Sequence, residues 1–168
     1  MKTNRTKRII FGLLPLAIIA TIAFGFRTPP GQVSFKCLVQ LTNYTGEGAY
    51  VVVSLVDSKG KYKKTLQVFG KDKRWWDDLP SWFKFYSNVK ENVDGVSGAS
   101  ITAGSRKVFS LTTDEEFYNK GYKLRFETAV EDQKYKEKDV EIDFSEASVG
   151  AASNGEGYIR YVKLIKNP

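Results

Sequence analysis

Short runs of alternating or β-branched residues, separated by turn signals, recur along this chain and constrain its fold more than any other feature. The seven runs cover residues 33–41, 50–56, 63–69, 107–111, 122–130, 140–144 and 158–165. Alternation with period two is typical of strands with one face buried, and Asp57-Ser-Lys-Gly between the second and third runs indicates a hairpin turn. The pattern predicts an all-β protein, an antiparallel β-sandwich of immunoglobulin-like type.

The N-terminus has the layout of an export signal. Four basic residues, Lys2, Arg5, Lys7 and Arg8, are followed by an uncharged, mostly apolar stretch from 9 to 26. This stretch is long for a signal peptide and just long enough to span a bilayer, so a cleaved signal and a retained N-terminal anchor helix both stay open. In either case the basic end stays inside and the chain after Arg27 is exported. We therefore divide the chain into a signal or anchor (1–27) and a single exported β-sandwich domain (28–168), periplasmic or membrane-anchored and facing the periplasm.

The charge of the exported part argues against nucleic acid as a partner. The whole chain has 26 basic and 19 acidic residues, a net charge of +7. Five of the basic residues and none of the acidic ones lie within 1–27, which leaves 21 against 19, or +2, for residues 28–168. A nucleic-acid interface needs a concentrated positive excess, and this segment has none. The acidic pairs Asp77-Asp78 and Glu131-Asp132 are interpreted as solvated surface rather than as a cation site.

Two residue types that are scarce narrow the chemistry further. The chain has no histidine and one cysteine, Cys37. Histidine-based catalytic triads, histidine-ligated metals, iron–sulfur clusters and an intrachain disulfide are thereby excluded. Cys37 alternates with apolar neighbours in a strand-like run, which predicts a buried structural thiol. We expect no catalytic residues and no metal ligands, so any redox chemistry requires an organic cofactor.

The segment 94–100 reads Asp-Gly-Val-Ser-Gly-Ala-Ser, a carboxylate followed by very small residues and ending in a hydroxyl. It resembles the motif at which a periplasmic flavin transferase esterifies FMN to a threonine or serine. The resemblance implies that Ser100 is the FMN acceptor and that Asp94, Ser97, Gly98 and Ala99 are read by the transferase. The alternative is an ordinary surface turn, since Asp-Gly and Ser-Gly pairs mark turns in many proteins.

A transferase must reach the Ser100 hydroxyl, so we expect residues 92–104 to form an exposed loop. Gly95 and Gly98 should relax its steric limits, and Ile101 should anchor it inward. Asp94 should accept hydrogen bonds from the backbone N–H groups that follow it.

A second resemblance covers residues 35–166. Its short motifs are Tyr50-Val-Val-Val-Ser, Asp57-Ser-Lys-Gly-Lys-Tyr, Thr65-Leu-Gln-Val-Phe-Gly-Lys, Arg74-Trp-Trp-x-x-Leu, Trp82 and the segment from Asp94 to Gly104. In this order they resemble the predicted periplasmic family catalogued as domain of unknown function 2271. The resemblance implies extracytoplasmic electron transfer with a covalent flavin. The family commonly has threonine where this chain has Ser100, and serine keeps the hydroxyl that forms the ester.

An aromatic segment at 74–88 interrupts the strand pattern just before the motif. Pro80 suits the first turn of a short helix, and three tryptophans, Trp75, Trp76 and Trp82, lie close together. One interpretation is a plug that caps one end of the sandwich. The other is that Trp75, Trp76 or Trp82 stacks on the flavin ring or guides a redox partner, and both can hold for different residues.

Together these observations predict an extracytoplasmic electron-transfer module that carries FMN covalently on Ser100. Its partners would be a flavin transferase and membrane or periplasmic redox proteins, with the inner membrane added if the anchor is retained. The alternative is a flavin-free immunoglobulin-like binding or scaffolding domain associated with a membrane redox system. A redox carrier or binding module is favoured over a self-sufficient enzyme, because the histidine base of a hydrolase is missing.

Overall fold

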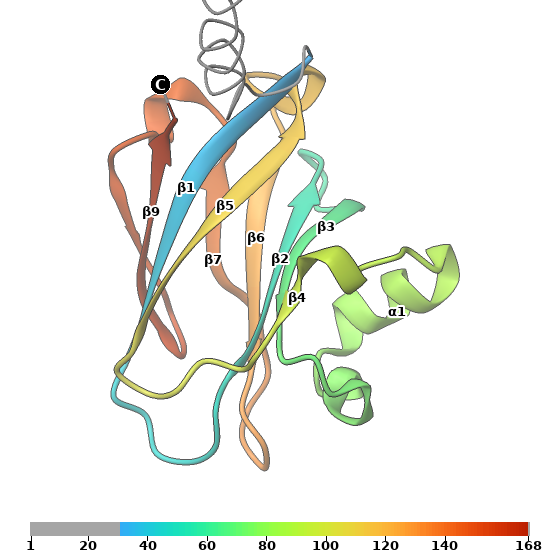
Figure 1. Cartoon of the computed structure of the whole chain (residues 1–168), viewed down its shortest axis with the longest axis vertical. Helices are drawn as coiled ribbons and strands as arrows, with labels where there is room; N and C mark the ends of the chain where they lie inside the picture. The colour runs from blue at the N-terminus through green and yellow to red at the C-terminus, as the bar shows by residue number, and fades with distance from the viewer. Residues whose placement is uncertain (1–30, 168) are drawn as a thin grey trace, which may run out of the picture.

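The computed structural model describes residues 31–167 and shows an all-β sandwich with one short α-helix (Figure 1). The strands are β1 (Gln32–Leu41), β2 (Tyr50–Val56), β3 (Tyr62–Phe69), β4 (Ser97–Gly98), β5 (Arg106–Asp114), β6 (Lys123–Ala129), β7 (Lys136–Asp143), β8 (Ala152–Asn154) and β9 (Ile159–Lys166), and the helix is α1 (Pro80–Val89). The predicted signal or anchor at 1–27 lies outside the described residues. Within 31–167 no helix combines the length and the apolar character needed to cross a bilayer.

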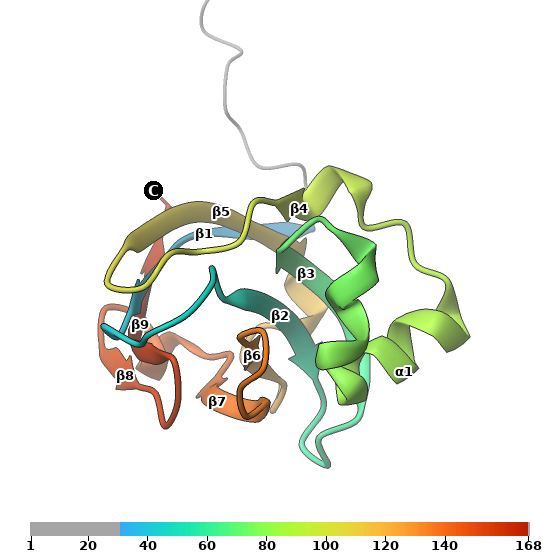
Figure 2. The same ribbon diagram turned by 90° about the horizontal axis from the view of Figure 1, so that it is seen from below.

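The nine strands form two sheets that face each other, as the view in Figure 2 shows. One sheet has the order β5-β1-β9-β8 and the other the order β4-β3-β2-β6-β7. Neighbouring strands are antiparallel except for β4, which pairs in parallel with the edge of β3 through Val68 and Ser97. The predicted β-sandwich is confirmed, with β4 as an additional short parallel edge.

The main core lies between the two sheets. Along β1 the residues Phe35, Cys37, Val39 and Leu41 are buried while those between them are not, as period two requires. On the opposite sheet Val51, Val53 and Leu55 point into the same cluster. Cys37 is buried as predicted, and burial raises the pKa of its thiol, which keeps the sulfur protonated and unreactive.

A second apolar cluster covers the outer face of the five-stranded sheet. Strand β2 is buried on both faces, and its outward residue Val52 packs with Trp76, Leu79 and Trp82. Trp82 comes from α1, Trp76 from the 3-10 helix Lys73–Asp78 that precedes it, and Leu79 from the junction between the two; Figure 1 shows α1 beside β3. The aromatic helix therefore lies over a sheet face and does not cap an end of the sandwich, because the outward side chains of β2 and β3 are apolar and need cover.

The start of α1 follows the sequence signals. Pro80 occupies the first turn, where its missing N–H leaves no hydrogen bond unmade, and Lys90 ends the helix in the left-handed conformation.

Beneath this helix the outer face of the five-stranded sheet buries a polar network. The fully buried Glu127 accepts hydrogen bonds from the hydroxyls of Tyr62 at 2.6 Å and Tyr135 at 2.5 Å. Burial raises the pKa of Glu127 to about 7.

The stretch 148–157, which is rich in Gly, Ala, Ser and Asn, contains β8. The buried carboxylate of Asp139 accepts the backbone N–H groups of Gly157, Tyr158 and Ile159 at 2.7–3.0 Å. These bonds fold the chain back so that Ser153 pairs with Val162 of β9. The strand depends on a distant carboxylate, so its own composition gave no sign of it.

Candidate functional site

The 94–100 motif lies on the segment that connects α1 to β5, and buried residues hold it at both ends. Val93 precedes it, and Ile101 follows it as predicted; both side chains lie in the apolar clusters. Ile101 and Ala49 exchange backbone hydrogen bonds of 2.8 and 2.9 Å. Between these anchors the chain makes a 3-10 turn, Asp94–Val96, and then β4. The expected exposed loop at 92–104 is thus partly correct, since Ser97 and Gly98 pair with β3 and are half-buried.

The polar side chains of the motif have different surroundings. The Ser97 hydroxyl donates to the carbonyl of Val93 at 2.7 Å and so closes the turn. The Asp94 carboxylate is exposed and lies 3.9 Å from the ammonium of Lys73. The expected bonds from the following N–H groups to Asp94 are not present in the described part of the chain. The turn bond is made instead by Asn92, whose Oδ1 accepts the N–H of Asp94 at 3.0 Å.

The motif glycines are not required by backbone conformation. Neither Gly95 nor Gly98 has a positive φ, so the expectation that they relax steric limits is wrong. A Cβ at Gly95 would meet nothing within 4 Å, and one at Gly98 would make an ordinary 3.6 Å contact with the ring of Phe69. The effect of these glycines is that the backbone beside Ser100 carries no covering side chains.

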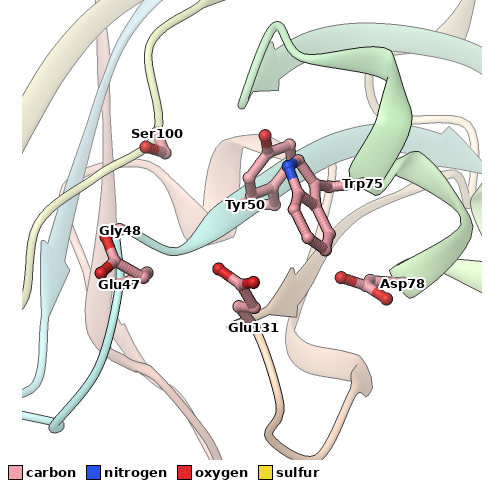
Figure 3. Close-up of a pocket in the computed structure, with 7 residues that line it drawn as sticks. All are labelled: Glu47, Gly48, Tyr50, Trp75, Asp78, Ser100 and Glu131. Atoms are coloured by element: carbon pink, nitrogen blue, oxygen red, sulfur yellow. The ribbon is translucent and has the colours of Figure 1, made fainter.

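Ser100 is half-buried and lines an open groove of about 160 Å³ (Figure 3). The groove is lined by Glu47, Gly48, Tyr50, Trp75, Asp78, Ser100 and Glu131. These residues come from the loop before β2, from β2 itself, from the 3-10 helix and from the loop after β6. The only motif side chain in the groove is therefore the one that the resemblance assigns as acceptor, and it does not point into the core.

Gly48 sets the space available to the Ser100 side chain. A Cβ at position 48 would lie 2.6 Å from the Ser100 Oγ and 3.1 Å from its Cβ. Real Cβ atoms do not approach so closely, so any larger residue at 48 forces the hydroxyl to move. The glycine is needed here for a close approach.

The three tryptophans divide into two kinds. Trp75 is 37% exposed and lines the groove, whereas Trp76 and Trp82 are buried in the outer cluster. The indole N–H of Trp76 donates to the carbonyl of Gly70 at 2.7 Å, and that of Trp82 donates to the Thr65 hydroxyl at 2.9 Å. The two buried rings make an edge contact at 5.1 Å. Of the three, only Trp75 is placed where a group on Ser100 can contact it.

The lining of the groove is acidic, with three carboxylates and no basic side chain. Figure 3 shows the side chains of Glu47, Glu131 and Asp78 in the lower part of the view, below Ser100, Tyr50 and Trp75. Burial raises the pKa of Asp78, and Asp77 and Asp132 add to the shift. Burial also raises the pKa of Tyr50, helped by the charges of Asp72, Asp78 and Glu131. Within residues 31–167 no group of three or more carboxylate or thiol side chains is arranged to hold a metal ion.

Sequence reasoning missed five lining residues: Glu47, Gly48, Tyr50, Asp78 and Glu131. Glu131 belongs to an acidic pair interpreted as solvated surface, and it does remain exposed while facing the groove. No local signal connects these positions with Ser100, because they are joined only by the pairing of Ala49 with Ile101 and by the packing of the 3-10 helix.

Comparison with known proteins places the chain in one family. A family model described as "Predicted periplasmic protein (DUF2271)" matches residues 32–161, most of the described domain. This agrees with the export predicted from the N-terminus. Searches of curated proteins and of solved structures returned no significant match.

Proposed function

The chain belongs to the family of predicted periplasmic proteins DUF2271, and we propose that it is an extracytoplasmic electron-transfer module carrying FMN as a phosphoester on Ser100. The observation that supports this most is the position of the Ser100 hydroxyl. It ends an Asp-x-x-Ser-Gly-Ala-Ser segment, lies at the border of an open groove, and has uncovered backbone before it.

The attachment is a phosphoryl transfer catalysed by a separate flavin transferase. The Ser100 oxygen attacks the phosphorus on the FMN side of the FAD pyrophosphate. A P–O bond to Ser100 forms, the bond to the AMP phosphate breaks, and AMP leaves while the hydroxyl proton passes to a base of the transferase. The described residues offer no histidine for this work, which is consistent with a separate enzyme as the catalyst. The role of this domain is to present the hydroxyl.

The groove favours a tethered flavin over one that is bound reversibly. Its volume of about 160 Å³ is below the roughly 300–1,000 Å³ of pockets that enclose small molecules. Its carboxylates also repel the phosphate of a free flavin, whereas a covalent ester does not depend on that attraction. A tether holds the cofactor at high effective concentration beside a groove that is too small and too acidic to retain it alone.

FMN, once attached, supplies reversible transfer of one or two electrons. Trp75 and Tyr50 present aromatic faces in the groove against which a flavin ring can stack. Because the groove is open, the rest of the ring stays accessible to membrane or periplasmic redox proteins. We propose these proteins, and the flavin transferase, as the partners.

The test is coexpression of the full-length protein with an active flavin transferase. The denatured protein should stay yellow and carry the mass of FMN less one water, with the adduct on the peptide containing Ser100. Ser100→Ala should abolish the adduct, whereas Thr102→Ala, which removes an exposed hydroxyl two positions away, should keep it. An adduct that survives Ser100→Ala refutes the site. No adduct despite an active transferase favours the flavin-free binding domain.

A further inference from the structure

A second and larger groove lies on the outer face of the five-stranded sheet, beside the C-terminal half of α1. It has a volume of about 830 Å³ and is bordered by the β2–β3 hairpin, by α1 and by β7. Its lining includes Lys59, Lys61, Lys63, Lys84, Lys138 and Arg125, with Glu137 as the single acidic side chain. The proposed flavin chemistry does not involve this groove.

The positive charge of the groove is largely uncompensated. In the described domain, the side chains of Lys59, Lys61, Lys84 and Lys138 make no ion pair, and all four are exposed. Lys63 pairs loosely with Asp57 at 3.7 Å. Arg125 is buried at the base and satisfied by Glu141 at 2.9 Å and Glu137 at 3.1 Å. The free charge thus lies on the rim, where a partner can meet it.

Between these charges the groove has an apolar surface. The rings of Tyr62 and Phe85 stack at 5.3 Å, and Arg125 lies over Tyr62 at 5.2 Å. Val89 lines the groove and is 56% exposed, one of the most exposed large apolar side chains of the described domain. Exposed apolar surface bordered by like charges is typical of an interaction site.

This groove is separate from the Ser100 groove. Tyr50 begins β2 and lines the Ser100 groove, while Tyr62 lines the basic groove and pairs with Val56 at the other end of β2. Six strand residues at about 3.3 Å each put roughly 20 Å between them. One groove is acidic and the other basic, so they attract partners of opposite charge.

We propose that the basic groove docks an acidic, amphipathic segment of a partner protein. Carboxylates of the segment meet the four unpaired lysines, and apolar side chains of the segment contact Tyr62, Phe85 and Val89. An inserted peptide can place apolar side chains on the half-buried rings of Tyr62 and Phe85, between the lysines, whereas a flat bilayer surface would contact the exposed lysines alone. Such docking charges raise the association rate and orient the partner.

The test uses the full-length protein and a short fluorescent peptide of alternating glutamate and leucine, followed by anisotropy. The groove variant is Lys61→Glu/Lys84→Glu/Lys138→Glu, one change on each bordering element. The matched control is Lys36→Glu/Lys120→Glu/Lys134→Glu, which changes the net charge equally. These three lysines are exposed, lie outside the groove and make no ion pair with any residue of 31–167. Circular dichroism confirms that both variants are folded.

The groove variant should bind the peptide roughly tenfold more weakly or worse, and the control should keep most of the affinity. A peptide with lysine in place of glutamate should not bind. Equal losses in both variants would show that only net charge matters and would overturn the proposal. Failure of the peptide to bind the unaltered protein would overturn it as well. A third outcome would also overturn the proposal: the protein binds phosphatidylglycerol vesicles and not the peptide, and only the groove variant loses vesicle binding. The groove would then be a membrane contact.

Discussion

The division of the tryptophans into core and groove residues gives a prediction that can be worked out from the structure. Trp82 is fully buried, packs against the rings of Trp76 and Tyr86 at 5.1 and 5.3 Å, and donates its indole N–H to Thr65. Truncating a buried large aromatic costs about 3–5 kcal/mol through lost transfer energy and the cavity that remains. The lost hydrogen bond adds about 1 kcal/mol, so Trp82→Ala should lower the free energy of unfolding by about 4–6 kcal/mol.

Trp75 provides the matched comparison on the same segment. Its side chain is 37% exposed and faces the groove, so Trp75→Ala should lower the free energy of unfolding by no more than about 1 kcal/mol. Urea denaturation followed by circular dichroism measures both values. In a thermal melt, a loss of about 4–6 kcal/mol in a domain of this size corresponds to a midpoint shift of roughly 10–25 °C.

In the flavinylated protein, Trp75→Ala should alter the fluorescence or the potential of the flavin and leave the fold intact. Trp82→Phe should recover most of the free energy of unfolding that is lost in Trp82→Ala. Equal destabilisation by Trp75→Ala and Trp82→Ala would refute the assignment of one to the groove and the other to the core. Unchanged flavin properties in the Trp75 variant would refute stacking.

Three further outcomes are expected. Gly48→Ala places a methyl group 2.6 Å from the Ser100 Oγ and should slow flavinylation in a coexpression time course. Gly95→Ala should not slow it, because a Cβ at position 95 meets nothing within 4 Å. Equal rates for the two variants would contradict the close contact between position 48 and Ser100. The folded-state pKa of Glu127, raised to about 7 from 4.5, means that its protonated form stabilises the fold fully below about pH 4.5 and that this contribution is lost as pH rises through about 7. Urea melts should therefore show that the free energy of unfolding of Glu127→Gln, relative to that of the unaltered protein, rises by about 2–3 kcal/mol as the pH increases from about 5 to about 8. Parallel pH profiles of the two proteins would contradict this. Glu131→Gln removes a negative charge that disfavours the reduced flavin and should raise its potential by roughly 10–30 mV in a spectroelectrochemical titration. Glu116→Gln, at an exposed position past the far end of β5 from Ser100, should lack this effect.

The strands could be predicted because the local pattern of apolar residues along each one indicates which of its positions are buried. β1 alternates, with Phe35, Cys37 and Val39 facing inward. β2 is an apolar run interrupted by Ser54, which is the pattern of a strand buried on both faces, and the aromatic helix covers its second face. β4 and β8 are two and three residues long and consist of small or polar residues, so only tertiary hydrogen bonds define them.

The candidate site was predictable in two of its residues, Ser100 and Trp75. Ser100 was identified from a contiguous motif, and Trp75 from the density of aromatics nearby. The groove around them is assembled from Gly48, Tyr50 and Glu131, which are separated from Ser100 by long stretches of sequence. Such proximity is set by sheet pairing and by the packing of the 3-10 helix, neither of which leaves a local pattern.

The measurement that tests the central claim most directly is the intact mass of this protein isolated from the exported fraction of its own cells. The proposed function predicts a mass that exceeds the polypeptide, with or without residues 1–27, by FMN less one water. Fragmentation should place that increment on Ser100. A polypeptide without the increment, recovered from cells whose flavin transferase is active, would contradict the claim that this domain carries a covalent flavin.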